Sequence, residues 1–218
     1  MIKADHKYWA RALFNPYINR LLKKHFSNFY LINDLPNIEG KKLILTPNHF
    51  SWWDGFFVDL LNRKIINRKF HILMLEDQLK RYWFFQKLGA YGFNPDNPKS
   101  ILEAVKYTNQ ILSNIDNFSI IYPQGKIYPF EQKPLSIKDG LRYFIKDSDS
   151  NLVMLPIAFK VNYEEEKLPS IYCKFGNLLE SDAVKKNYQL FIDSFSKNIE
   201  ELKELTLNNN YKNNLFVL

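Results

Sequence analysis

The sequence has little cysteine, little glycine and no long apolar run. Its 218 residues include one cysteine, Cys173, which cannot form a disulfide within the chain and therefore indicates a reducing compartment. Seven glycines argue against a glycine-rich or repetitive architecture. No apolar stretch reaches the length of a transmembrane helix, and charged residues interrupt the N-terminal region where a signal peptide would need an apolar core. These absences predict a soluble or membrane-surface protein of the cytoplasm.

The composition is otherwise apolar, aromatic and basic. Hydrophobic residues make up 46% of the chain, with 18 Phe and 13 Tyr, which fits a globular protein. A chain of this length is expected to form one domain with a sizeable core. The formal net charge of +7 favours anionic partners. Nucleic acid, an anionic membrane surface, and coenzyme A or an acidic carrier protein all meet that condition.

Short apolar runs alternate with segments of helical periodicity through most of the chain. We therefore predict an α/β fold, a single domain in which helices flank a mixed, largely parallel sheet. Asn97 and Pro98 have the residue types of an N-cap and a first helical position. The predicted helices cover residues 98–115, 140–146 and, as one long helix, 181–202, followed by a loop at 208–210. The predicted strands cover residues 43–45, 69–75, 89–93, 118–122, 152–159 and 171–175.

Residues 1–28 are predicted to form an amphipathic, basic helix ahead of a domain at 29–218. Between residues 5 and 27, apolar side chains recur every four residues in two adjacent stripes, and Lys and Arg supply a basic surface. Such a helix can lie in a membrane interface, or it can pack on the domain with its charges in solvent. Residues 79–88 are also aromatic and basic, which suits a surface that faces a membrane or an acyl chain.

A histidine and an aspartate lie where a predicted strand gives way to a helix. His49 and Asp54 fall between the strand at 43–45 and a helix whose apolar residues begin at Phe56. Within one helix, five residues would turn these two side chains about 140° apart. They can therefore act together only if His49 lies in the loop and Asp54 in the first helical turn. There Asp54 can accept one imidazole N–H and leave the other nitrogen as a base.

The stretch Asn48-His49-x-Ser51-x-x-Asp54 resembles the first motif of the glycerolipid acyltransferases, the lysophosphatidate acyltransferase type. Those enzymes share three further motifs. The second contains an Arg that helps to hold the acceptor phosphate, and here Gly89 to Pro95 occupies its place, with Pro95 where the Arg would stand. The fourth motif, an apolar strand with a central proline, matches Leu155-Pro156-Ile157.

The third motif of that family usually reads Phe-Pro-Glu-Gly-x-Arg. Here it reads Tyr122-Pro123-Gln124-Gly125-Lys126-Ile127, so that Gln124 replaces the Glu and Ile127 replaces the Arg. A Lys-x-Gly sequence follows at Lys138. The four motifs stand in the family's order and spacing over residues 40–160, and this order carries the resemblance more than any one motif does.

The resemblance implies an O-acyltransferase in which His49 is the general base and Asp54 orients it. It implies transfer of a fatty acyl group from acyl-CoA or acyl carrier protein to a hydroxyl of a lysophospholipid such as 1-acylglycerol-3-phosphate, with no metal or other cofactor. We expect such an enzyme of phospholipid biosynthesis to bind, as a peripheral protein, the anionic cytoplasmic face of the membrane. The candidate substrate-binding residues are Asn48, Ser51, Pro123, Gln124, Gly125, Lys126 and Lys138.

Two other readings of the sequence stay open. The acceptor could be a glycolipid or aminolipid hydroxyl, such as that of a lyso-ornithine lipid. Alternatively, the chain could be a non-catalytic basic module that binds anionic membranes or nucleic acid. The pair of His49 and Asp54 argues against such a module, and the basic residues are dispersed, so we expect no nucleic-acid partner. The remaining histidines, His6, His25 and His71, show no metal-ligand spacing.

Overall fold

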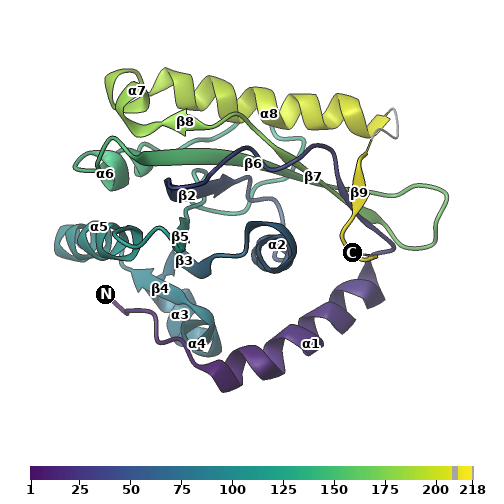
Figure 1. The fold of residues 1–218 in the computed structure, drawn as a ribbon, viewed down its shortest axis with the longest axis horizontal. Coiled ribbons are helices and arrows are strands. Elements are labelled where there is room, and N and C mark those ends of the chain that lie inside the picture. The colour runs from purple at the N-terminus through teal and green to yellow at the C-terminus, as the bar shows by residue number, and fades with distance from the viewer. Residues whose placement is uncertain (208–210, 218) are drawn as a thin grey trace.

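The computed structural model describes residues 1–207 and 211–217, so the loop predicted at 208–210 lies outside the described residues. At its centre is a mixed sheet with the strand order β4-β3-β5-β2-β6-β7-β1-β9 (Figure 1). All neighbours from β4 to β6 are parallel, whereas β7 is antiparallel to β6. The predicted α/β fold with a largely parallel sheet is thereby confirmed. The strands are β1 (Phe29–Leu31), β2 (Lys42–Pro47), β3 (Lys69–Leu75), β4 (Ala90–Phe93), β5 (Asn117–Ile120), β6 (Leu152–Asn162), β7 (Ser170–Phe175), β8 (Leu179–Glu180, paired with β6) and β9 (Asn213–Asn214).

Helices cover both faces of this sheet, which explains why its central strands are apolar throughout. In β2, Leu43 and Leu45 belong to the core on one face and Ile44 to the core on the other. Helices α1 (Tyr8–His25) and α2 (Asp54–Leu61) cover the first face. The second face packs against α5 (Pro98–Leu112), α6 (Leu141–Ile145), α7 (Ser181–Lys186) and α8 (Gln189–Leu207). A π-helical turn (Asn62–Ile66) and the short helices α3 (Glu76–Arg81) and α4 (Phe84–Leu88) complete the order.

Local side-chain chemistry sets where several helices begin. Asn97 caps α5, because its Oδ1 accepts from the backbone N of Lys99 at 3.0 Å, and Pro98 is the first helical residue. The prediction of one helix over residues 181–202 is wrong, since the chain is interrupted between α7 and α8. Asn187 has an extended backbone there, and its Oδ1 accepts from the backbone N of Gln189 at 3.1 Å, which starts the second helix.

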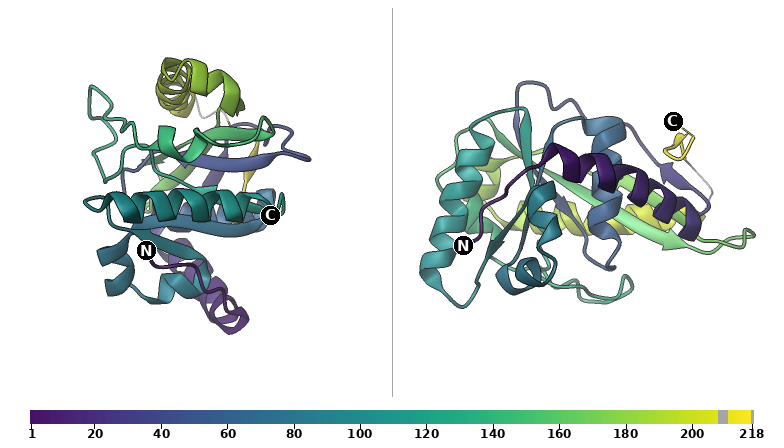
Figure 2. Two further views of the ribbon diagram at one scale, coloured as in Figure 1. Left: turned by 90° about the vertical axis from the view of Figure 1, so that its left-hand side faces the viewer. Right: turned by 90° about the horizontal axis from the view of Figure 1, so that it is seen from below.

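Helix α1 packs along the domain, across the face that Figure 2 shows from below. Its buried stripe consists of Ala10, Phe14, Ile18 and Leu22. The adjacent stripe, formed by Trp9, Leu13 and Tyr17, faces outward with exposed fractions of 49%, 64% and 61%. The sequence predicted both stripes, and packing buries the one that contains Phe14. Within residues 1–207 and 211–217, no helix is both long and apolar enough to cross a membrane.

Contacts on either side of the start of α1 fix its position. Ile2 forms an antiparallel bridge with Gly92 of β4, in which the backbone N of Ile2 donates to the oxygen of Gly92 at 2.9 Å. The Arg11 guanidinium donates to the buried Asp59 carboxylate of α2 and, at 2.6 Å, to the carbonyl oxygen of Leu88. The helix is therefore joined to α2, whose first residue is Asp54.

Candidate active site

The turn between β2 and α2 brings His49 and Asp54 into contact. Asp54 is the first residue of α2, as the spacing requires, and Nδ1 of His49 lies 2.9 Å from its Oδ2. The same oxygen accepts from the backbone N of Phe50 at 2.8 Å and of Ser51 at 2.9 Å. The Ser51 hydroxyl accepts from the backbone N of Trp53 at 3.0 Å and thereby holds the turn. Asp54 thus fixes both the imidazole and the loop that carries it.

Burial and hydrogen bonding act in opposite directions on the Asp54 carboxyl. The side chain is fully buried, and this burial raises its pKa, whereas the donors from His49, Ser51 and Phe50 favour the carboxylate. A carboxylate accepts hydrogen bonds only, so Nδ1 of His49 carries the proton that it donates to Asp54. The other imidazole nitrogen, Nε2, is left with a lone pair, which is the arrangement that a general base needs.

The loop that follows β5 holds His49 from the opposite side. Oε1 of Gln124 accepts from the backbone N of His49 at 2.6 Å, and the backbone N of Tyr128 donates to the oxygen of His49 at 3.0 Å. The ring of Tyr122 stacks on the imidazole, with centroids 4.2 Å apart and planes 24° apart. Contacts from residues 122–128 therefore fix the backbone and the ring plane of His49.

Asn48, at the start of the loop that carries His49, joins that loop to β6. Its Nδ2 donates to the oxygen of Phe159 at 2.9 Å and its Oδ1 accepts from the backbone N of Phe159 at 2.7 Å. The side chain is buried, with an exposed fraction of 3%, and both of its polar atoms are engaged in these bonds. Asn48 therefore shapes the loop from below, rather than presenting a polar group to a ligand.

Two lysines lie on the outer part of the second loop. Gly125 has a φ of +72°, a left-handed conformation that glycine adopts without strain, and the backbone N of Lys138 donates to the oxygen of Pro123 at 2.8 Å. Lys126 and Lys138 are exposed. A hydrogen bond with Ser136 and the charges of these two lysines lower the pKa of the neighbouring Tyr128 hydroxyl. This part of the loop is a cationic surface beside His49.

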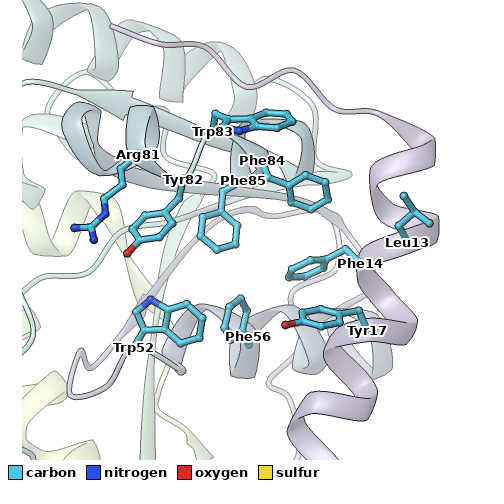
Figure 3. A pocket seen from close by; sticks show the side chains of 10 residues that line it. All are labelled: Leu13, Phe14, Tyr17, Trp52, Phe56, Arg81, Tyr82, Trp83, Phe84 and Phe85. Carbon is cyan, nitrogen blue, oxygen red and sulfur yellow. The ribbon is translucent and has the colours of Figure 1, made fainter.

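An apolar cleft of about 560 Å³ opens next to the His49 loop. Figure 3 shows Phe14 and Tyr17 of α1 facing Phe56 of α2, with Tyr82 and Phe85 on the opposite wall. Trp52, three residues after His49, lies on the same cleft, and its ring centroid is 4.8 Å from that of Phe56. The remaining lining residues are Leu13, Arg81, Trp83 and Phe84. Its walls come from three separate segments of the chain, two of which the sequence singled out as aromatic and basic.

The structure gathers most, but not all, of the predicted site residues. His49 and Ser51 lie in one loop, which ends at Asp54, the first residue of α2. The residues on the loop facing it are Pro123, Gln124, Gly125, Lys126 and Lys138. Asn48 lies beneath them. Pro95, at the place of the second motif, follows β4 at the edge of the sheet, with β3 and β5 between it and β2. Sequence reasoning did not select Tyr122 or Tyr128 as site residues, although Tyr122 is the first residue of the third motif and Tyr128 directly follows that motif.

Comparison with known proteins bears on what this arrangement does. Residues 27–160, which contain both loops and β2 to most of β6, match the acyltransferase family. The chain belongs to this acyltransferase family. The family membership that the four motifs predicted is thereby confirmed. A comparison with proteins of curated function found no match.

A solved structure shares the fold of this acyltransferase. It is the 1-acyl-sn-glycerophosphate acyltransferase PlsC from Thermotoga maritima, with a TM-score of 0.60 and 15% sequence identity. The similarity covers 88% of the present chain and 79% of the PlsC chain. At this identity the likeness concerns the fold alone.

Proposed function

We propose that this acyltransferase moves a fatty acyl group from a thioester donor, acyl-CoA or acyl carrier protein, to a hydroxyl of a lysophospholipid such as 1-acylglycerol-3-phosphate. The observation that carries the proposal is the contact of 2.9 Å between His49 and Asp54, at the turn whose Trp52 lines an apolar cleft. The pair supplies a base, and the cleft supplies a dry surface for an acyl chain. Family membership supports acyl transfer, and the lipid acceptor is our inference from the cleft and the motifs.

The proposed reaction needs a base because an alcohol is a poor nucleophile toward a thioester. Nε2 of His49 removes the proton of the acceptor hydroxyl while the oxygen attacks the thioester carbonyl carbon. Asp54 stabilises the imidazolium that forms. The tetrahedral intermediate then expels the thiolate, which takes the proton from His49 and leaves as a thiol. Every atom and charge is balanced with the two substrates alone, so the reaction as proposed uses no metal and no further cofactor.

The surface around the cleft favours action at a membrane. Trp9, Trp52 and Trp83 are exposed by 49%, 54% and 58%, and indole rings favour the interface between water and lipid. We infer that the surface formed by these three tryptophans rests on the anionic cytoplasmic face of a membrane as a peripheral contact. A lysolipid would then reach His49 directly from the membrane. The exposed cations Lys126 and Lys138 would meet phosphate groups of the donor or of the acceptor.

A thioester-consumption assay tests this function. The purified chain is given palmitoyl-CoA, and separately palmitoyl carrier protein, with a panel of lysophosphatidate, zwitterionic lysophospholipids, a lyso-ornithine lipid and a lysoglycolipid in vesicles. Thiol release that depends on one of these acceptors, together with formation of the acylated product, is the expected result. Binding to vesicles without any acceptor-dependent thiol release would instead favour a non-catalytic membrane-binding module.

The loss of two arginines specifically favours a second class of acceptor. Pro95 and Ile127 occupy places where relatives carry an Arg that holds a phosphate. A bidentate Arg contact serves to recognise a doubly charged phosphate. Binding of a glycolipid or aminolipid acceptor needs no such Arg–phosphate contact. The acceptor panel decides between the two classes by the ratio of their kcat/KM values.

A further inference from the structure

The donors that could stabilise an oxyanion near His49 are few, because most backbone N–H groups of its loop are already engaged. The N–H groups of Phe50 and Ser51 donate to Asp54, and that of His49 donates to Gln124. An N–H group that already donates at 2.6–2.9 Å within the protein is not available to a substrate oxygen without losing that bond. Hydrogen-bond donors for an oxyanion must therefore come mainly from another part of the chain.

Several backbone N–H groups of the facing loop also donate hydrogen bonds within the protein. The N–H of Gly125 donates to the oxygen of Tyr122 at 3.1 Å, and that of Tyr128 donates to His49. Near His49, the backbone N–H groups without an acceptor in the described part of the chain include those of Trp52, Tyr122, Gln124, Lys126 and Ile127. Trp52, Lys126 and Ile127 belong to exposed residues, whereas Gln124 is buried, with an exposed fraction of 2%. Buried, fixed donors are the ones that stabilise charge effectively in a reaction.

The orientation of the Gln124 amide follows from its contact with His49. The backbone N–H of His49 requires an acceptor, so the oxygen of the amide faces His49 and the NH₂ group occupies the other branch of the same planar group. No acceptor among residues 1–207 and 211–217 binds this Nε2. Nε2 of Gln124 has no partner there, yet it is not one of the fully buried polar atoms without a partner. The small exposed part of Gln124 therefore includes its NH₂ group. Gln124 thus presents two donor hydrogens beside His49.

We propose that Nε2 of Gln124 donates a hydrogen bond to the thioester carbonyl oxygen as it becomes an oxyanion, an inference that rests on the proposed acyl transfer. When the acceptor oxygen bonds to the carbonyl carbon, its proton passes to Nε2 of His49 and the carbonyl π electrons move to the oxygen. The amide of Gln124 stabilises that charge until the thiolate leaves and the carbonyl re-forms. A Glu, usual in the family's third motif, would accept from His49 equally well but would repel the oxyanion.

This difference makes Gln124→Glu a sharp test. The carboxylate keeps an acceptor for the backbone N of His49 but removes the donor, so a purely structural role for Gln124 would survive the change. We expect kcat with palmitoyl-CoA to fall by about 10²–10³-fold, as for the loss of one oxyanion donor, with little change in KM. The added charge would also move the acid limb of the pH profile upward, so kcat is compared on the alkaline plateau. Gln132→Glu, the same substitution in the same loop, is the matched control and should leave kcat unchanged.

Two further measurements keep the inference open to refutation. Gln124→Met, which removes donor and acceptor together, should lower kcat at least as much, and it serves as the test if Gln124→Glu does not fold. A plateau kcat within about threefold of wild type in either folded variant would overturn the donor role, since a lost donor costs far more. A wild-type chain that releases no thiol with any donor and acceptor of the panel would instead overturn the proposed function itself.

Discussion

The Nε2 atoms of His6 and His71 lie 3.1 Å apart, and the two rings meet edge to face. Nδ1 of His71 lies 3.2 Å from the carbonyl oxygen of Lys69, so this nitrogen carries a proton and Nε2 of His71 accepts from His6. Burial lowers the pKa of His6 to about 3, with further contributions from His71, Lys69 and Arg11, and burial lowers the pKa of His71 to about 4. The neutral pair joins the segment before α1 to β3.

Stability is expected to fall as the pH drops from about 7 toward 4. In the unfolded chain both histidines take up protons near pH 6.5, whereas in the folded chain they stay neutral until about pH 4 and pH 3. Between these values the unfolded state binds more protons, so acid favours unfolding. The contribution is fully present above about pH 7 and, after allowance for partial solvent exposure, about 1–2 kcal/mol is lost by pH 5.

Urea unfolding at pH 7.5 and pH 5 measures this loss. The variant His6→Gln removes one titrating group of the pair and should reduce the difference in unfolding free energy between the two pH values. Asp5, Lys69 and Arg11 also face His6, and they remain in the variant, so the comparison isolates the histidine. An equal pH dependence of wild type and variant would show that the pair does not control acid stability.

The second prediction concerns the proposed base and its partner. His49→Ala should lower kcat by about 10²–10⁴-fold, the usual contribution of general base catalysis. Asp54→Asn should also be severe, because a neutral amide cannot stabilise the imidazolium that forms on His49. Thiol release is measured together with thermal unfolding, which identifies any loss caused by misfolding. Transfer at nearly the wild-type rate by folded His49→Ala would contradict the mechanism.

The local part of this site was predictable and the long-range part was not. The sequence spacing alone required His49 in a loop and Asp54 in the first helical turn, because the two residues are five positions apart in a stretch with clear strand and helix patterns. The bond between His49 and Gln124 joins residues 75 positions apart. No periodicity or turn signal encodes such a contact, which arises because β2 and β5 are neighbours in the sheet. The sequence could rank Gln124 as a site residue but could not place its amide.

The third prediction separates the two parts of Tyr122. Its hydroxyl is buried and has no hydrogen-bond partner within residues 1–207 and 211–217, and burial, with the charge of Asp54, raises the pKa of this hydroxyl well above the usual value. An unpaired buried hydroxyl is unfavourable by about 1–3 kcal/mol, so Tyr122→Phe should raise the melting temperature while retaining the ring that stacks on His49. Tyr122→Leu should lower kcat, because the imidazole loses its stacking partner. Thermal unfolding and kcat of both variants are the measurements, and a loss of stability in Tyr122→Phe would indicate an unseen partner for the hydroxyl.

Helix α1 shows a further limit of sequence patterns. Two apolar stripes lie side by side on it, and their periods are identical, so only packing against α2 and α4 selects the one that contains Phe14 for the core. The stripe left outside is the more aromatic one. Both readings of the sequence are therefore compatible with the packing: α1 packs on the domain with one stripe and has a second stripe free for a membrane.

The fourth prediction tests that free stripe. The triple variant Trp9→Ser, Leu13→Ser, Tyr17→Ser should lose flotation with anionic vesicles while it remains folded, because all three side chains are exposed. Deleting residues 1–28 would be a poorer test, since it also removes the buried stripe. The matched control is Tyr163→Ser, because Tyr163 is an exposed aromatic residue in the loop between β6 and β7. Binding of wild type should weaken with added salt, and flotation of the triple variant equal to wild type would place the membrane contact elsewhere.

The last prediction concerns the acceptor. The two lysines beside the site, Lys126 and Lys138, are exposed, so solvent and salt screen their attraction for a phosphate. An ammonium group also lacks the bidentate fork that the family's arginines supply, and Pro95 and Ile127 supply no charge at all. We therefore expect kcat/KM for lysophosphatidate to exceed that for a zwitterionic or uncharged acceptor by less than about tenfold, the scale of one screened ion pair.

Single substitutions of the lysines measure how much of that selectivity each cation supplies. Lys126→Ala and Lys138→Ala should each lower kcat/KM for lysophosphatidate by only a few-fold and leave that for an uncharged lysolipid unchanged, because a screened contact contributes below about 1 kcal/mol. Lys133→Ala is the matched control, since Lys133 lies on the same loop and pairs with Glu200 of α8 at 3.6 Å. A preference for lysophosphatidate of about a hundredfold or more that either substitution abolishes would contradict this expectation. It would also identify the lysine that replaces the missing arginines, and it would mean that the loop closes on the phosphate when the acceptor binds.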